Sequence, residues 1–100
     1  MARLDLYRLA GLDGYVLEVQ ADLLAILATA VVVPLLPLEQ APKPISRLNP
    51  VFEIGKRPYV MVTQSIAAVP RAELGQAAGA LENGRHFEVV NALDMLLSGI

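Results

Sequence analysis

The chain has 100 residues, of which 55% are apolar and 18% are charged, with a formal net charge of −2 and an isoelectric point near 5.2. This length fits one domain over residues 1–100, and the charged fraction is below the roughly 25% of an average soluble domain. The eight basic residues are scattered along the chain. This argues against direct nucleic-acid binding, because a phosphate-binding surface needs clustered Lys and Arg.

The apolar surplus has to be buried somewhere. The longest apolar run, Leu23 to Leu38, contains Thr29 and two prolines and is shorter than the ~20 residues that a membrane span requires. We therefore expect no membrane segment, and we expect burial in a homodimer interface instead. The chain has no cysteine, and its first residues, MARLDLYRLA, lack the apolar stretch of a signal peptide. The expected location is cytoplasmic.

The first half of the chain predicts antiparallel strands. Residues 3–9 alternate polar and apolar side chains, a Gly-Leu-Asp-Gly turn follows, and residues 15–20 form the second strand of an expected hairpin. Residues 31–36 are a run of Val and Leu typical of a strand buried on both faces. Because proline cannot donate to a strand ladder, Pro34 predicts an edge or a bulge at that point.

The second half adds two strands and one helix. Residues 51–54 and 59–64 are predicted strands joined by a Gly-Lys-Arg-Pro turn. Residues 70–74 predict a short helical turn, residues 75–84 a mixed linker, and residues 85–97 a long helix. These elements predict a β-rich α+β fold, a small SH3-like barrel or bent antiparallel sheet of about five strands with one C-terminal α-helix.

The predicted helix is apolar over most of its circumference. At 100° per residue, Glu88, Asn91, Asp94 and Ser98 form a narrow polar stripe. Phe87 falls near the middle of this stripe, where a large exposed aromatic side chain is costly unless a partner covers it. The helix is therefore expected to pack against its own sheet and against a second subunit.

The sequence offers little for catalysis. His86 is the only histidine, and no serine is paired with it by local sequence, so no Ser-His-Asp set can be built. The ten carboxylates are spread evenly without metal-type spacing, and we interpret most of them as solvated strand and turn residues. We expect no metal, no cofactor and no enzymatic activity, and we favour a binding function.

Five segments in order resemble one known family: VLEVQADLL, VVVPLLPL, LNPVFEI, MVTQSIAAVP and the terminal NALDMLLSGI. Together they resemble the CcdB toxins of toxin–antitoxin modules over nearly the full chain. The resemblance implies a two-fold homodimer that is not an enzyme. It also implies binding to the A subunit of DNA gyrase, which such toxins trap on cleaved DNA, and neutralisation by a CcdA-like antitoxin that is partly disordered when free.

The resemblance also assigns a gyrase-binding surface with three parts: Leu23 and Leu24; Asn91 and Asp94; and the chain end Ser98, Gly99 and Ile100. Core packing is the alternative for the two loop leucines. We interpret a second set of helix residues as the buried side of the helix and the dimer interface, namely Leu93, Leu96 and Leu97.

Two departures from the family bear on function. Ser98 stands where the plasmid-borne members carry a tryptophan, so the aromatic anchor for gyrase is missing. Apolar residues replace charged ones elsewhere, and we expect a contiguous apolar patch formed by Ile26, Ala30, Phe87 and Val90. Such a patch is explained by a divergent member that binds a different partner, or by a redesigned surface that docks onto another copy or another protein; ordinary sequence drift is the default explanation. The alternative hypothesis is therefore a CcdB-scaffold dimer whose altered target-facing surface forms a protein assembly interface, with a larger assembly as one outcome and without toxin activity.

A third hypothesis is a ribonuclease of the related toxin superfamily. Such an enzyme needs a basic catalytic residue and a hydroxyl in one groove. No such pair stands out in the sequence.

Overall fold

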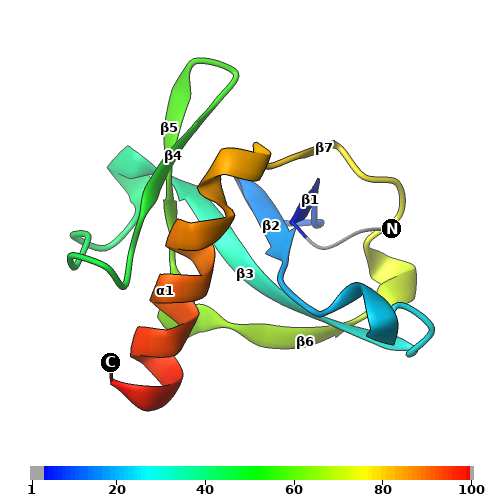
Figure 1. Cartoon of the computed structure of the whole chain (residues 1–100). Helices are drawn as coiled ribbons and strands as arrows, with labels where there is room; N and C mark the ends of the chain where they lie inside the picture. The colour runs from blue at the N-terminus through cyan, green and yellow to red at the C-terminus, as the bar shows by residue number, and fades with distance from the viewer. Residues whose placement is uncertain (1–3, 100) are drawn as a thin grey trace.

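The computed structural model describes residues 4–99. It is a curled antiparallel sheet that forms a half-barrel, with one long helix packed against it (Figure 1). The strands are β1 (Asp5–Tyr7), β2 (Tyr15–Glu18), β3 (Thr29–Pro37), β4 (Val51–Ile54), β5 (Arg57–Met61), β6 (Ala67–Pro70) and β7 (Gly79–Ala80). The helix is α1 (His86–Ser98), and the short 3-10 turns are η1 (Asp22–Leu24), η2 (Leu38–Gln40), η3 (Thr63–Ser65), η4 (Arg71–Glu73) and η5 (Asn83–Arg85). The predicted α+β fold with one C-terminal helix is confirmed.

The nine-residue strand β3 organises the sheet. The strand order is β4-β5-β3-β2-β1-β7, and β6 pairs with β3 outside this path. One edge of β3 pairs with β2, while its other edge pairs first with β6 and then with β5. Because two successive strands share one edge, the sheet has to bend around β3, which closes it into a half-barrel.

The expectation for Pro34 was wrong. This residue lies in the middle of β3, opposite Val16 of β2, and not at an edge. Its carbonyl accepts from the Val62 N–H at 2.9 Å, so its backbone faces the gap between β5 and β6. In this gap no paired strand residue has a carbonyl that would accept a hydrogen bond from the backbone nitrogen of residue 34. A proline, which lacks the N–H, is therefore tolerated in this central strand.

Both predicted hairpins are confirmed. Strands β1 and β2 pair in antiparallel fashion, as do β4 and β5. The β4–β5 turn places Gly55 at φ 58° and Lys56 at φ 67°, the positive pair that a two-residue type I′ turn requires. The sequence did not predict β6, and the stretch interpreted as a linker contains β7.

The two faces of the sheet carry separate apolar cores. The larger core lies under α1, whose Val89 and Ala92 are fully buried in it; its other large members are Leu17, Leu35, Phe52 and Met61. The smaller core on the opposite face contains Tyr7, Val16, Ala30, Val32 and Leu74. Between residues 4 and 99, no helix is long and apolar enough to cross a membrane.

Candidate protein-binding site

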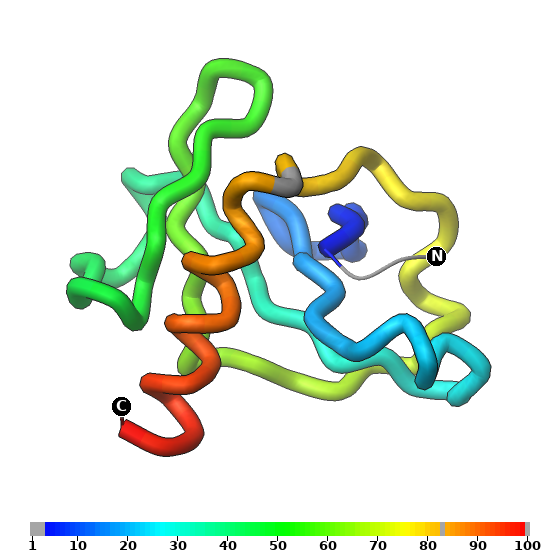
Figure 2. Tube along the Cα trace, in the orientation of Figure 1, coloured from blue at the N-terminus to red at the C-terminus, as the bar shows by residue number. Residues whose placement is uncertain are grey.

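The β2–β3 loop, residues 19–28, turns apolar side chains outward. Leu23 is 86% exposed and Ile26 is 92% exposed, while Leu24 and Leu27 are each a little under half exposed. We call these four side chains the loop surface. Figure 2 shows the loop at the opposite end of the molecule from the C-terminal end of α1. Core packing as the alternative for Leu23 is therefore wrong, because its side chain is exposed to solvent.

The backbone of this loop is held by hydrogen bonds that point inward. The Gln20 amide donates to the carbonyl oxygens of Leu24 at 3.1 Å and Thr29 at 3.2 Å, and its oxygen accepts from the Val31 N–H at 3.2 Å. Two backbone turns also hold the loop: the Leu24 N–H donates to the Ala21 carbonyl, and the Leu27 N–H donates to the Leu24 carbonyl. The polar backbone is thus satisfied internally and the apolar side chains project, so the loop surface is ordered before any partner arrives.

A buried ion pair lies beneath the loop. Glu18 is 2% exposed at the end of β2, and its carboxylate receives the Arg71 guanidinium at 2.9 and 3.4 Å. The Tyr7 hydroxyl, 3.4 Å from the same carboxylate, donates to it. Our interpretation of most carboxylates as solvated does not hold for Glu18, because a charged group that is removed from water needs a partner of opposite charge.

The pKa values of this cluster reflect the pairing. Hydrogen bonding to Glu18 raises the pKa of Arg71 above its usual range. Burial raises the pKa of the Tyr7 hydroxyl, and the negative charge of Glu18 adds to the effect. Both groups therefore keep their protons at neutral pH, and the cluster stays a fixed anchor under the loop.

The outward stripe of α1 forms a second exposed region. Asp94 and Ser98 are exposed and Asn91 is half-buried, and Phe87 on the same stripe is 73% exposed. Gly99 ends the helix with φ 72°, and its N–H donates to the Met95 carbonyl at 3.0 Å. This left-handed cap turns the chain out of the helix axis. The predicted site residue Ile100 lies outside the described residues.

The structure does not bring the two regions together within one protomer. Figure 1 shows β6 running between the C-terminal end of α1 and the β2–β3 loop. Leu23 and Leu24 therefore lie apart from Asn91, Asp94, Ser98 and Gly99. A partner that contacts both regions has to be extended, or has to meet them on two copies of the chain.

The expected contiguous patch is not formed. Ala30 is fully buried in the smaller core, because its position in β3 faces the sheet interior and not the solvent. Val90 is half-buried, and the β2–β3 loop, which carries the exposed Ile26, lies apart from α1, which carries the exposed Phe87 (Figure 1). Ile26 therefore belongs to the loop surface, and Phe87 belongs to the outward stripe of α1.

The predicted dimer residues divide into two kinds. Leu93 packs against the larger core of its own protomer, so much of its side chain is not available to a partner. Leu96 is half-buried, and Leu97 is 75% exposed at the last turn of α1. Only the end of the helix therefore offers free leucine surface.

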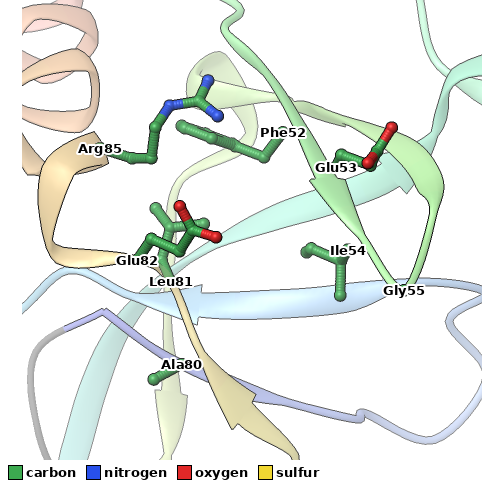
Figure 3. A pocket seen from close by; sticks show the side chains of 8 residues that line it. All are labelled: Phe52, Glu53, Ile54, Gly55, Ala80, Leu81, Glu82 and Arg85. Carbon is green, nitrogen blue, oxygen red and sulfur yellow. The ribbon is translucent and has the colours of Figure 1, made fainter.

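A cavity of about 420 Å³ lies between β4, β7 and the N-terminal end of α1 (Figure 3). Figure 3 shows its side chains: Phe52, Ile54, Leu81 and Ala80 are apolar, while Glu53, Glu82 and Arg85 are charged. The Arg85 carbon that carries the charge lies 4.6 Å from the Phe52 ring centre.

Arg85 is also bonded to Glu88 through two nitrogens, one of them at 3.0 Å. This pairing lowers the pKa of the Glu88 carboxyl and raises that of Arg85. Over residues 4–99 no group of three or more His, Cys, Asp or Glu side chains is arranged to hold a metal ion.

The residues that sequence reasoning missed are the ones that order the loop. No local sequence pattern marks Gln20 or Arg71 as residues that hold the loop, and Leu27 does not differ in the sequence from the other residues of the apolar run. A signal existed in the sequence: Glu18 interrupts an otherwise apolar strand, and an inward carboxylate demands a cation elsewhere in the chain.

Comparison with solved structures defines the class of fold. An endoribonuclease in complex with its cognate antitoxin from Mycobacterial species is similar with TM-score 0.77 and 20% identity, over 97% of this chain and 94% of that one. An endoribonuclease from Mycobacterial species is similar with TM-score 0.75 and 22% identity, over 97% of this chain and 90% of that one. A structure described as an Mtb toxin is similar with TM-score 0.73 and 15% identity, over 88% of this chain and 94% of that one. The half-barrel with its C-terminal helix is thus a fold that this chain shares with two endoribonucleases, one of them bound to its cognate antitoxin, and with one toxin.

A family model described as CcdB protein matches residues 3–99. The chain therefore belongs to the CcdB family, as the resemblance implied. A search of curated proteins found no match.

One expectation is corrected by these comparisons. We expected no enzymatic activity, but two of the similar structures named above are described as endoribonucleases. The lack of a Ser-His-Asp set was too narrow a criterion, because RNA cleavage does not need one.

Proposed function

We propose that this chain is a toxin that binds the A subunit of DNA gyrase through the loop surface and the outward stripe of α1, and that a cognate antitoxin neutralises it. The observation that carries the proposal is the ordered loop with Leu23 and Ile26 almost fully exposed. Burial of one such side chain stabilises a complex by about 1.5–3 kcal/mol. A rigid apolar projection is the kind of feature that acts as an interface anchor.

The α1 stripe supplies the second contact in this proposal. Asn91, Asp94 and Ser98 provide polar groups on one face, and the capped end at Gly99 places the following residue clear of the helix. In the absence of an aromatic residue at position 98, exposed Phe87 on the same stripe is the available aromatic anchor.

The test is binding to purified gyrase A subunit together with a supercoiling assay. Leu23→Asp and Ile26→Asp should each weaken binding about 30-fold or more, since an anchor is worth about 2 kcal/mol. Ile45→Asp is the matched control, because Ile45 is also an exposed isoleucine, 52% accessible, on a different loop. Deletion of Gly99 and Ile100 should abolish binding. Equal effects of the two isoleucine substitutions would contradict the assignment.

We further propose that the toxin acts as a homodimer in which the free leucine surface at the end of α1 contacts a second copy. Leu97 supports this, since it is apolar and three-quarters exposed. A dimer would place two loop surfaces and two α1 stripes on one particle. Leu97→Asp should convert the dimer to a monomer by light scattering, and an unchanged mass would exclude this interface.

A second candidate is endoribonuclease activity, which is favoured by the two similar structures so described. RNA cleavage without a metal needs a base for the 2′-hydroxyl and a cation for the phosphate. The cavity of Figure 3 offers Glu82 and Arg85 for these roles. Cleavage of a single-stranded RNA by the purified chain that is lost in Glu82→Gln would support this candidate over gyrase poisoning.

A further inference from the structure

The loop surface is anchored by a residue that does not belong to it. We propose that Arg71 is a positioning residue, held by Glu18, that keeps the β2–β3 loop in the conformation that presents Leu23, Leu24, Ile26 and Leu27 to the target. This inference rests on the proposed function, but it concerns residues to which the resemblance assigns no role.

Arg71 joins three separate parts of the fold. Its terminal nitrogens bind the two Glu18 oxygens at 2.9 and 3.4 Å, and its Nε donates to the Leu27 carbonyl at 3.3 Å. Its own backbone N–H donates to the Ala28 carbonyl at 2.8 Å. One residue of η4 therefore fixes two consecutive carbonyls of the loop to the end of β2.

Glu18 sets the direction of the guanidinium. The ion pair is almost removed from solvent, with side-chain exposures of 12% for Arg71 and 3% for Glu18. A planar guanidinium bonded through both terminal nitrogens cannot rotate without breaking two bonds, so its Nε stays directed at Leu27. This is a geometry that lysine, with a single ammonium, cannot reproduce.

Arg71 and Gln20 hold different halves of the loop. The Gln20 amide reaches the carbonyls of Leu24 and Thr29, which bracket the segment. Arg71 reaches Leu27 and Ala28, next to Ile26, the most exposed side chain of the loop surface. Loss of the Arg71 side-chain bonds should release Leu27, while the backbone bond from Arg71 to Ala28, the Gln20 bonds and the sheet stay in place.

Release of the loop should lower target affinity without removing any contact. The apparent dissociation constant rises by the inverse of the fraction of molecules that hold the binding conformation. Freeing one or two residues should make that fraction about one tenth or less. We therefore expect Arg71→Lys to weaken binding to the gyrase A subunit about tenfold or more.

The experiment compares Arg71→Lys with Arg57→Lys. Arg57 pairs with Glu39 in an exposed ion pair at 3.2 Å, far from the loop, so it controls for the chemical change itself. Binding to purified gyrase A subunit and amide hydrogen exchange are measured on both variants and on the unsubstituted chain. The diagnostic amides are Ala25 and Leu27, whose N–H groups donate to Asp22 and Leu24 inside the loop.

The expected result is tenfold weaker binding and faster exchange at Ala25 and Leu27 for Arg71→Lys, with neither change for Arg57→Lys. Unchanged exchange at the two loop amides would overturn the inference, as would unchanged affinity despite faster exchange. If Arg71→Lys fails to fold, Glu18→Gln, which keeps a hydrogen-bonding oxygen and removes the charge, takes its place with the same two readouts. If the unsubstituted chain does not bind gyrase, the proposed function fails, and hydrogen exchange alone decides whether Arg71 orders the loop.

Discussion

The position of Gly14, directly before β2, allows almost no side chain. Its φ is +136°, and a Cβ built there would lie 2.2 Å from the Leu35 carbonyl oxygen in the backbone of β3. Gly11 in the same turn also has a positive φ, +82°, but a Cβ there would meet nothing within 4 Å. The comparison separates backbone strain, which both positions have, from a collision with backbone that only Gly14 has.

We therefore predict that Gly14→Ala lowers the free energy of unfolding by about 3 kcal/mol or more, and Gly11→Ala by only about 1 kcal/mol. Urea denaturation monitored by circular dichroism measures both. Equal losses for the two variants would show that the strand β3 moves aside and that the close approach at Gly14 does not matter.

The Tyr7 hydroxyl predicts a pH dependence at the alkaline end. Its pKa in the fold is raised above the ordinary value of 10.0 by burial first and by the charge of Glu18 second. Above pH 10 the unfolded chain loses this proton while the folded chain keeps it. The unfolded state then binds fewer protons, so the free energy of unfolding falls as pH rises through this range. The stabilisation that the protonated Tyr7 hydroxyl contributes to the fold is fully present below pH 10.

Tyr7→Phe should remove that part of the alkaline loss. The measurement is the difference in unfolding free energy between the unsubstituted chain and Tyr7→Phe at pH 8 and at pH 10.5. The gap should narrow at the higher pH. A gap that stays constant would mean that the hydroxyl does not resist ionisation in the fold.

At the scale of elements, α1 has few fully buried side chains. Only Val89 and Ala92 are fully buried, so the fit of the helix on the larger core depends on a small residue at the contact. Ala92→Leu should overpack this contact and cost about 1–3 kcal/mol. Met95→Leu, a change of similar volume at a half-buried position of the same helix, should cost less than about 1.5 kcal/mol. Thermal unfolding of the two variants gives the comparison, and equal costs would show that Ala92 is not the tight point.

Elements with local signals were predictable from the sequence. The type I′ turn at Gly55 and Lys56 and the apolar run of β3 both carry their pattern within a few residues. Strands β6 and β7 were missed because they are two to four residues long and mostly exposed, so no alternation marks them. They are strands only because a neighbouring strand offers them an edge.

The candidate site shows the same division. Leu23 and Leu24 could be singled out from the sequence, but not their exposure, which follows from how the loop backbone is tied down. The Glu18–Arg71 pair joins residues 53 positions apart, and no local pattern predicts such a pair. The contiguous patch failed because period-two alternation in β3 places Ala30 on the inner face.

At the scale of the whole molecule, the two exposed regions differ in how they can contribute to binding. The loop surface is apolar, the α1 stripe carries the exposed Asp94 and the partly exposed Glu88 that is paired with Arg85, and the chain has a net charge of −2. Burial of apolar surface does not depend on counterions, whereas contacts to phosphates release them. Salt dependence therefore discriminates between a protein target and an RNA target, whichever residues make the contacts.

We predict that the dissociation constant for the gyrase A subunit changes by less than about threefold between 50 and 200 mM salt, because exposed charges contribute little to an apolar interface. A ribonuclease substrate held through several phosphates would lose affinity by about two orders of magnitude or more over the same range. The same protein preparation should be titrated with gyrase A subunit and with a single-stranded RNA, and Ile26→Asp should be included in both series. If RNA binding is steeply salt-dependent and insensitive to Ile26→Asp while gyrase binding is absent, the cavity of Figure 3 and not the loop surface is the functional site.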